Sequence, residues 1–263
     1  YLNKLKLNIN SSFQSTQLIH FGEENIYELQ MRLTTISYET KLSIPFNQNS
    51  QYIFGIQAYN QINSNINNRQ TILLPNAKIN NYSIFSFYEN NISKNILLQA
   101  GIRYDYKIIN TENTSDPADT ISFRPKINKD YSNFSYSTGI AYKPTEKITI
   151  KSNIASAFRT PTLPELTSLG QHETRFEIGD ASLKNQKSIE YDLSTHFHSN
   201  NYIFDFAAFY NNIINYIFIS PTNQYINNLQ IYQYKQSNAY ISGFETAIHF
   251  HPQNMQFLHL QSS

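Results

Sequence analysis

The sequence predicts an all-β protein that forms an antiparallel transmembrane β-barrel portion with about 10 to 13 long strands. Three observations favour this fold class. Polar and apolar residues alternate along many segments, and these segments have about nine to eleven residues. Short turns and long loops alternate between them. No composition shift or linker divides the chain, so we expect residues 1–263 to lie in one barrel domain.

The alternation is clearest in residues 96–107, ILLQAGIRYDYK. Ile102 and Tyr104 share one face of this segment with other apolar residues, whereas Arg103 and Asp105 lie on the opposite face. Successive side chains of a strand point to opposite faces, so a period of two indicates a strand rather than a helix. The same pattern recurs at residues 134–142, 188–198 and 202–210.

The length of these segments and the position of their charges favour a membrane setting. Strands of globular proteins peak near five or six residues, whereas a tilted strand needs about nine to eleven to cross hydrocarbon. Glu190 and Asp192 share one face of their segment, as expected if one side meets a wet lumen and the other meets lipid. An interfacial girdle is predicted for aromatic residues near strand ends, namely Tyr104, Tyr106, Tyr142, Tyr202 and Tyr210.

The connections fall into two length classes. Short polar turns are predicted at residues 47–50, 90–95, 143–147, 199–201 and 252–254. Long segments lie between them, at residues 60–80, 108–130, 159–187 and 211–231. This sorting predicts a barrel with short periplasmic turns and long extracellular loops. The predicted strands are residues 1–9, 12–20, 26–34, 36–46, 51–59, 82–89, 96–106, 133–142, 148–158, 188–198, 202–210, 240–250 and 256–261.

Composition excludes several other classes of protein. A net charge of +1 excludes a broadly basic nucleic-acid binder, so we expect no nucleic-acid partner. The absence of cysteine excludes a disulfide scaffold, a cysteine-ligated zinc module and a thiol enzyme. No phosphate loop, Gly-x-Ser-x-Gly or His-Glu-x-x-His motif occurs, and we expect neither an enzyme nor a resident cofactor. The start, YLNKLKLNIN, does not have the pattern of a signal peptide.

Three short motifs occur in residues 148–251: Phe-Arg-Thr-Pro at 158–161, Pro-Glu-Leu at 164–166, and a Gly-x-x-x-Leu step at 179–183. With these motifs, residues 148–251 resemble the TonB-dependent outer-membrane receptors. The later segments 207–217 and 241–252 fit the same family, as does the Arg-Tyr-Asp ending of the strand at 97–107.

The resemblance implies an active importer in the outer membrane of a Gram-negative bacterium. In this family a 22-stranded barrel surrounds a plug that contacts the TonB complex, and the cargo is a ferric siderophore, haem, a metal or another scarce nutrient. The chain contains no plug and no TonB-contacting box, so we expect it to be an internal fragment of the barrel. A half barrel has two open edges, which hydrocarbon does not tolerate, so this piece alone is not expected to insert.

The loop at 159–187 holds most of the candidate ligand-binding residues, namely Arg159, His172, Glu173 and Arg175. This stretch resembles one in haem receptors, where Phe-Arg-Ala-Pro is followed by a histidine and then by Asn-Pro-x-Leu. Here Thr160 replaces the alanine, and Asp180-Ala181 stands in place of Asn-Pro. A neutral imidazole ligates haem iron or zinc, so His172 is the candidate metal ligand. The ordinary alternative is a polar loop tip, or a strand-end structure shared by receptors of all ligand classes.

Other residues offer weaker hypotheses. Tyr216, in the aromatic segment 211–234, is a candidate for stacking on a ligand, or else part of a girdle and strand extension. The pairs His196/His198 and His249/His251 each place two imidazoles on one strand face, near a short turn. Each pair could share a metal ion, but the favoured interpretation is that they are ordinary amphipathic residues at the barrel edge.

Two further functions remain open at this point. A soluble extracellular all-β protein that binds carbohydrate would have a closed apolar core and shorter strands. A β-rich glycosidase would place Glu190 and Asp192 in a cleft as its paired carboxylates. The transport hypothesis instead requires alternate residues to contact lipid and water.

Overall fold

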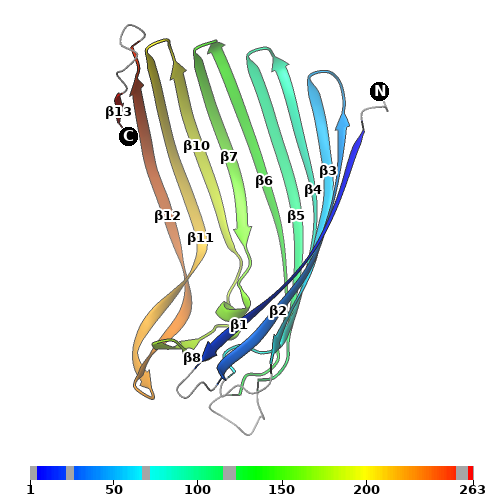
Figure 1. Ribbon diagram of the computed structural model, residues 1–263, viewed down its shortest axis with the longest axis vertical. Coiled ribbons are helices and arrows are strands. Elements are labelled where there is room, and N and C mark those ends of the chain that lie inside the picture. Colours follow the sequence, from blue (N-terminus) through cyan, green and yellow to red (C-terminus); the bar gives the residue numbers. More distant parts are fainter. Residues whose placement is uncertain (1–4, 22–26, 67–71, 115–122, 253–259, 263) are drawn as a thin grey trace.

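The computed structural model describes residues 5–21, 27–66, 72–114, 123–252 and 260–262. They form one sheet of 13 strands (Figure 1). The strands are β1 (Lys6–Phe21), β2 (Tyr27–Pro45), β3 (Ser50–Asn65), β4 (Ala77–Ser93), β5 (Ile96–Thr111), β6 (Asn128–Thr145), β7 (Ile148–Arg159), β8 (Leu169–His172), β9 (Arg175–Ile178), β10 (Gln186–His198), β11 (Tyr202–Ile226), β12 (Leu229–Phe250) and β13 (Leu260–Ser262). The helix α1 (Leu163–Thr167) lies between β7 and β8.

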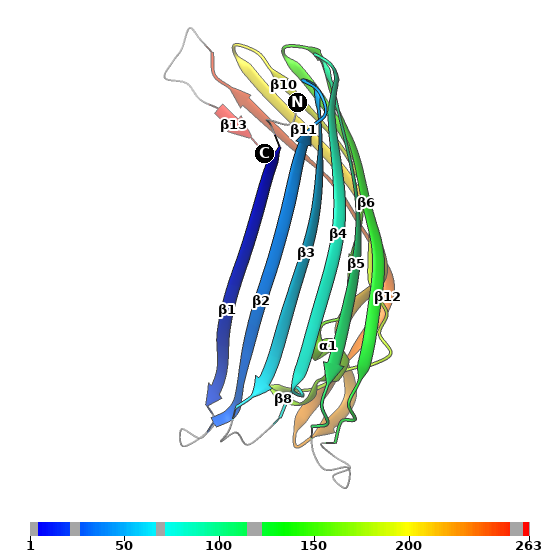
Figure 2. The same cartoon turned by 90° about the vertical axis from the view of Figure 1, so that its right-hand side faces the viewer.

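The sheet is an antiparallel meander that curves into a trough (Figures 1 and 2). Neighbouring strands follow chain order from β1 to β7 and continue with β10, β11 and β12. The short turns lie at one end of the trough and the long connections at the other (Figure 1). The fold class predicted from the sequence is therefore confirmed, and so is the sorting of connections, except between β11 and β12, where a tight turn replaces a predicted long loop. Within the described part of the chain, no helix is long and apolar enough to cross a bilayer.

The two faces of the sheet differ in chemistry. The outer face, turned away from α1, carries aligned apolar residues such as Ile56, Ile84 and Tyr104. Ile102 is 56% exposed and Leu193 is 48% exposed, and no second sheet covers them among the described residues. The hypothesis of a soluble carbohydrate-binding protein requires a closed apolar core around these residues, and the described residues do not form one. A slip of one residue between strands would reverse the faces, so the register preserves this sidedness.

The inner face carries a polar network at mid-height. Arg103 donates from Nε and Nη2 to the carboxylate of Asp105, at 2.7 and 2.8 Å. Its Nη1 donates to Gln57 at 2.6 Å, and Gln57 in turn donates to Glu39. The hydroxyl of Ser83 donates to Asp105 at 2.5 Å. Arg103 and Asp105 thus lie on the inner face of the wall, the face that the sequence pattern assigns to the lumen.

Some predicted strands are longer in the structure. The sequence predicts two strands at residues 1–9 and 12–20, but residues 6–21 form the single strand β1. Residues 26–34 and 36–46 likewise merge, since β2 runs over 27–45. Polar residues do not end these strands, because polar side chains pair with one another on the inner face: Ser12 and Ser37, for example, share a hydroxyl hydrogen bond of 2.6 Å between β1 and β2. Residues 1–4, 26, 67–71, 115–122, 253–254 and 256–259 of the predicted strands, turns and long segments lie outside the described residues.

The prediction of a long loop at 211–231 is wrong. β11 continues to Ile226 and β12 begins at Leu229, so this segment is a hairpin that extends the wall. Asn227 and Asn228 have φ of 50° and 64°. Two successive residues with positive φ form the tight hairpin turn that suits the twist of paired strands, and asparagine tolerates it well. The segments at 60–80 and 108–130 are also partly strand.

Candidate ligand-binding site

The segment between β7 and β10 folds back into the trough, and we call residues 160–185 the strap. Its start is set by Arg159 at the end of β7, whose Nη1 donates to both carboxylate oxygens of Glu165, at 2.8 and 2.7 Å. Glu165 also accepts from the backbone N–H of Thr162 at 2.7 Å, and the Thr162 hydroxyl caps the first turn of α1. This capping box and a proline in the first turn begin the helix.

The strap then packs closely against itself. The Cβ of any residue other than glycine at position 179 would lie 2.5 Å from the backbone N of Thr167. The N–H of Gly179 donates to the carbonyl of Ser168 at 2.7 Å. Leu163, Leu166 and Leu183 are buried against inner-face residues of the wall. The three sequence elements that carry the family resemblance therefore build the strap and anchor it in the mouth of the trough.

We expect Gly179→Ala to destabilise the strap by about 1–3 kcal/mol, because the backbone of α1 cannot move away from the added methyl group. Amide hydrogen exchange of residues 160–185 in the full-length protein measures this effect. Gly139→Ala is the matched control, since its Cβ would meet the rotatable side-chain oxygen of Asn153 at 3.2 Å. Equal protection of the strap in both variants would contradict the packing argument.

The strap crosses the trough from one part of the wall to another. At its near side, the N–H of Leu169 donates to the carbonyl of Leu73, in the connection between β3 and β4. Arg124, from the connection between β5 and β6, donates to the carbonyl of Ser168 at 2.6 Å. At its far side, β9 pairs in parallel with residues 230–233 of β12. Three distant segments of the sequence thus hold the hairpin of β8 and β9.

A buried carboxylate organises the end of this hairpin. Glu177 is 2% exposed, and its Oε1 lies 2.9 Å from Nδ1 of His172. The same oxygen accepts from Nε of Arg175 at 2.7 Å, and it lies 2.6 Å from Nη2 in an ion pair. Its Oε2 accepts from the hydroxyl of Tyr234 at 3.1 Å. The guanidinium of Arg175 also lies 5.4 Å from the ring centre of Tyr232. Side chains of β8, β9 and β12 therefore converge on one carboxylate.

This carboxylate orients the imidazole of His172. An ionised carboxylate only accepts hydrogen bonds, so Nδ1 of His172 donates to Glu177 and the lone pair of a neutral imidazole is at Nε2. A carboxylate behind a histidine fixes the tautomer and orients the ring, as the groups behind the ligands do in metal sites. The side chain of His172 is 42% exposed. The arrangement therefore presents one nitrogen ligand beside the exposed cation of Arg175.

The pKa of Glu177 reflects the same contacts. Burial raises the pKa, but hydrogen bonds from His172 and Arg175 outweigh burial and hold it below the ordinary value of 4.5. A folded-state pKa that is lowered contributes stability above the ordinary pKa, and this contribution is lost as pH falls through the lowered value. We therefore expect hydrogen-exchange protection of residues 175–178, corrected for intrinsic rates, to stay constant from pH 7 to about pH 5. At pH values below about 4 the protection should decrease. Constant protection down to pH 3 would contradict this assignment.

The structure brings together only some of the candidate residues from the sequence. His172 and Arg175 lie side by side on Glu177, whereas Arg159 is engaged with Glu165 at the base of α1. Glu173 forms the turn between β8 and β9, with φ of 53°, and its side chain is exposed. Tyr216 stacks near Phe218 at 6.3 Å between ring centres, on the opposite side of β11 from the buried Ile217.

The sequence pattern does not single out Glu177 and Tyr234 as site residues. The spacing of Arg175 and Glu177, two apart, could have indicated a shared strand face. The contact with Tyr234 had no such signal, because it depends on a parallel pairing between segments 57 residues apart.

The histidine pair at 196/198 and the carboxylates Glu190 and Asp192 make ordinary contacts with neighbouring side chains. His196 and His198 have parallel rings 6.4 Å apart, and Nδ1 of His196 lies 2.7 Å from Asp205. Within the described ranges, no group of three or more metal-binding side chains is assembled. Glu190 accepts from Asn211 at 2.5 Å, and Asp192 accepts from Asn153 at 3.3 Å, so both carboxylates bond amides of adjacent strands on the inner face.

Long tilted strands, an apolar outer face and a polar inner face define the wall of a large β-barrel of membrane type. A family model described as TonB dependent receptor-like, beta-barrel, matches residues 3–261. The chain therefore belongs to the TonB-dependent receptor β-barrel family, which confirms the resemblance seen in the sequence. Members of this family are outer-membrane transport receptors of Gram-negative bacteria and are not enzymes.

The chain is also similar to individual known proteins. The chain is 27% identical over 158 residues to hemoglobin-haptoglobin utilization protein B of Neisseria meningitidis serogroup C, covering 56% of this chain and 19% of that protein. The fold matches the copper transporter OprC with a TM-score of 0.75 at 12% identity, over 94% of this chain and 41% of that one. It matches the Serratia marcescens hemophore receptor HasR with a TM-score of 0.67 at 12% identity, over 94% and 46%. The chain thus spans less than half of each.

Proposed function

We propose that this chain is part of an outer-membrane receptor that captures a scarce iron-bearing nutrient outside the cell and imports it with TonB-derived energy, with haem as the first candidate. The outer face would contact the lipid bilayer, and residues 1–263 would form part of one barrel domain. A plug domain of the full-length receptor would contact the TonB complex. The long connections, including the strap, would face the outside of the cell.

The observation that carries the choice of haem is the pairing of His172 with Glu177. A histidine whose Nδ1 is held by a carboxylate is suited to bind iron through Nε2. Arg175, held by the same carboxylate, offers a cation to an anionic group of the ligand. The name of the relative that utilises hemoglobin-haptoglobin points the same way. Ferric siderophores are the second candidate, since Arg175 and Tyr232 form a cation–π pair that an anionic aromatic ligand could join.

Growth of the source bacterium tests this proposal. Iron-limited cells that lack the gene would be supplied in turn with haem, with haemoglobin, with a ferric siderophore, or with copper in a copper-limited medium. We expect the deletion to abolish growth on haem or haemoglobin alone and the full-length gene to restore it. Loss of growth only on a siderophore or on copper would overturn haem as the ligand. Unchanged growth on every source would overturn the import function.

A further inference from the structure

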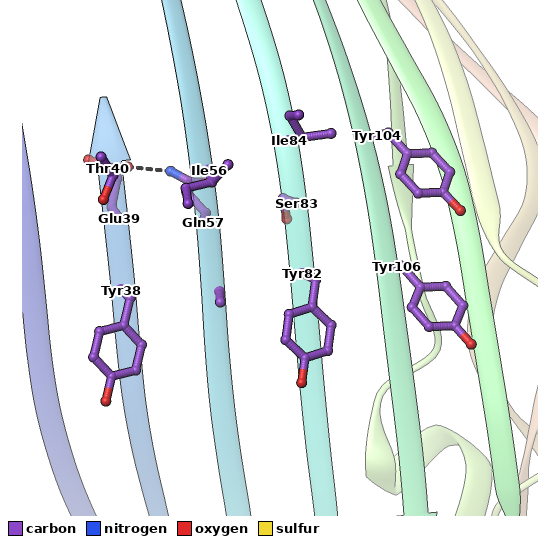
Figure 3. A pocket seen from close by; sticks show the side chains of 11 residues that line it. Tyr38, Glu39, Thr40, Ile56, Gln57, Tyr82, Ser83, Ile84, Tyr104 and Tyr106 are labelled. Carbon is purple, nitrogen blue, oxygen red and sulfur yellow. Dashed lines mark hydrogen bonds between the residues drawn. The ribbon is translucent and has the colours of Figure 1, made fainter. Parts of the chain in front are cut away.

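The outer face carries a row of tyrosines that a single alanine interrupts. Tyr38 on β2, Ala58 on β3, Tyr82 on β4 and Tyr106 on β5 are successive register partners. Because partners in register share a face, Ala58 leaves a gap between the rings of Tyr38 and Tyr82. Figure 3 shows these two rings on either side of β3, with both phenol hydroxyls pointing toward the end that carries the long connections. We call this gap the tyrosine slot (Tyr38, Ala58 and Tyr82).

The slot opens into an apolar depression of about 350 Å³. On the side of the short turns, its outer-face lining is formed by Thr40, Ile56 and Ile84, with Tyr104 at the edge (Figure 3). This volume lies at the lower end of the range for small-molecule sites. The depression is therefore large enough for part of a ligand, and its lining is apolar at the end nearest the middle of the wall.

Polar groups follow in order toward the long connections. The next outer-face row holds Asn60 and Asn80, whose side chains share a hydrogen bond of 2.8 Å. The row beyond it holds Ile62 and Lys78, and the lysine side chain is exposed. Lys78 lies four residues along the wall from the row of Ala58, about 13 Å at the rise of a strand. The wall thus presents an apolar slot, then amides, then a cation.

We propose that the tyrosine slot holds an acyl chain of a phosphorylated glycolipid of the outer leaflet, of the lipid A class. This inference rests on the proposed outer-membrane location. The chain would fill the slot beside Ala58, the amide or ester link would bond the side chains of Asn60 and Asn80, and the phosphate would pair with Lys78. This order of apolar chain, polar link and anion matches the order of groups on the wall. Aromatic rings at this level suit the interface, where chain and headgroup meet.

Native mass spectrometry of the full-length receptor tests the proposal after extensive washing in detergent. Lipid A, phosphatidylethanolamine and phosphatidylglycerol would be added in separate arms. We expect the wild type to keep one lipid A molecule and to release both phospholipids. Ala58→Phe fills the slot and should weaken lipid A retention about tenfold or more, the equivalent of about 1.4 kcal/mol. Lys78→Gln removes the cation at an exposed position and should weaken it by a smaller factor.

Ala208→Phe is the matched control, because Ala208 also lies on the outer face, between Leu193 and Phe244 in register. It should retain lipid A like the wild type. Should Ala58→Phe fail to fold, Lys78→Gln still decides, since unchanged retention in that variant overturns the proposal. The proposal is also overturned if the wild type retains a phospholipid as well as it retains lipid A. It is likewise overturned if the wild-type receptor forms a dimer that displaces the lipid. A receptor that reaches the outer membrane and imports its nutrient without retaining lipid A refutes this inference alone.

Discussion

Replacing His172 with alanine is expected to weaken the binding of haem to the full-length receptor by about 100-fold or more. The variant removes the nitrogen that Glu177 orients, and even indirect support of a ligand is worth about 10- to 100-fold in metal affinity. The side chain is partly exposed at the hairpin of β8 and β9, so the strap should stay folded. Titration of haem, followed by its visible absorption, measures both affinity and the loss of an axial nitrogen ligand.

His198→Ala is the control for this experiment. His198 lies beside the short turn at the opposite end of the wall, and its loss should leave haem affinity unchanged. If His172→Ala binds haem with wild-type affinity and an unaltered spectrum, His172 is not a ligand.

Replacing Glu177 is expected to have the second largest effect. Glu177→Ala leaves the hydroxyl of Tyr234 and the guanidinium of Arg175 without their buried partner. The loss of such a partner costs about 2 kcal/mol, and we expect the pairing of β9 with β12 to loosen accordingly. Haem affinity should fall about 10- to 100-fold because the imidazole of His172 loses its orienting carboxylate.

Glu177→Gln separates the two effects. The amide keeps the shape of the side chain and one acceptor oxygen, so hydrogen exchange of residues 175–178 should lie between that of the wild type and Glu177→Ala. Glu146→Ala, in the exposed turn between β6 and β7, is the control with no expected effect. Wild-type exchange and affinity in Glu177→Ala would show that the carboxylate neither holds the strap nor positions His172.

Much of the wall can be predicted from the sequence because its physics is local. Alternation assigns each residue of a strand to a face, so the sequence pattern alone places Ile102 and Arg103 on opposite sides of the wall. The ends of strands are less accessible to this reasoning. Backbone hydrogen bonding between strands does not require alternating side chains, and β11 runs on past Asn211 and Asn212 to Ile226.

The candidate site can be predicted only in part. His172 and Arg175 are close in sequence, and their chemistry indicates a possible ligand set. The carboxylate that unites them is Glu177, and its burial depends on the pairing of β9 with β12 and on Tyr234. That pairing is parallel and long-range, and hydrophobic periodicity does not specify it.

The sidedness of the wall is the claim on which the transport account rests, and a cysteine scan along β4 tests it most directly. The chain has no cysteine, so each single-cysteine variant from residues 82 to 89 of the full-length receptor carries one label in this part of the wall. Spin labels at 82, 84, 86 and 88 should be accessible to oxygen in the bilayer. Labels at 83, 85, 87 and 89 should be accessible to a water-soluble relaxation agent or contact protein. Accessibility without this period of two, or lipid exposure at residues 83 and 85, would contradict the account.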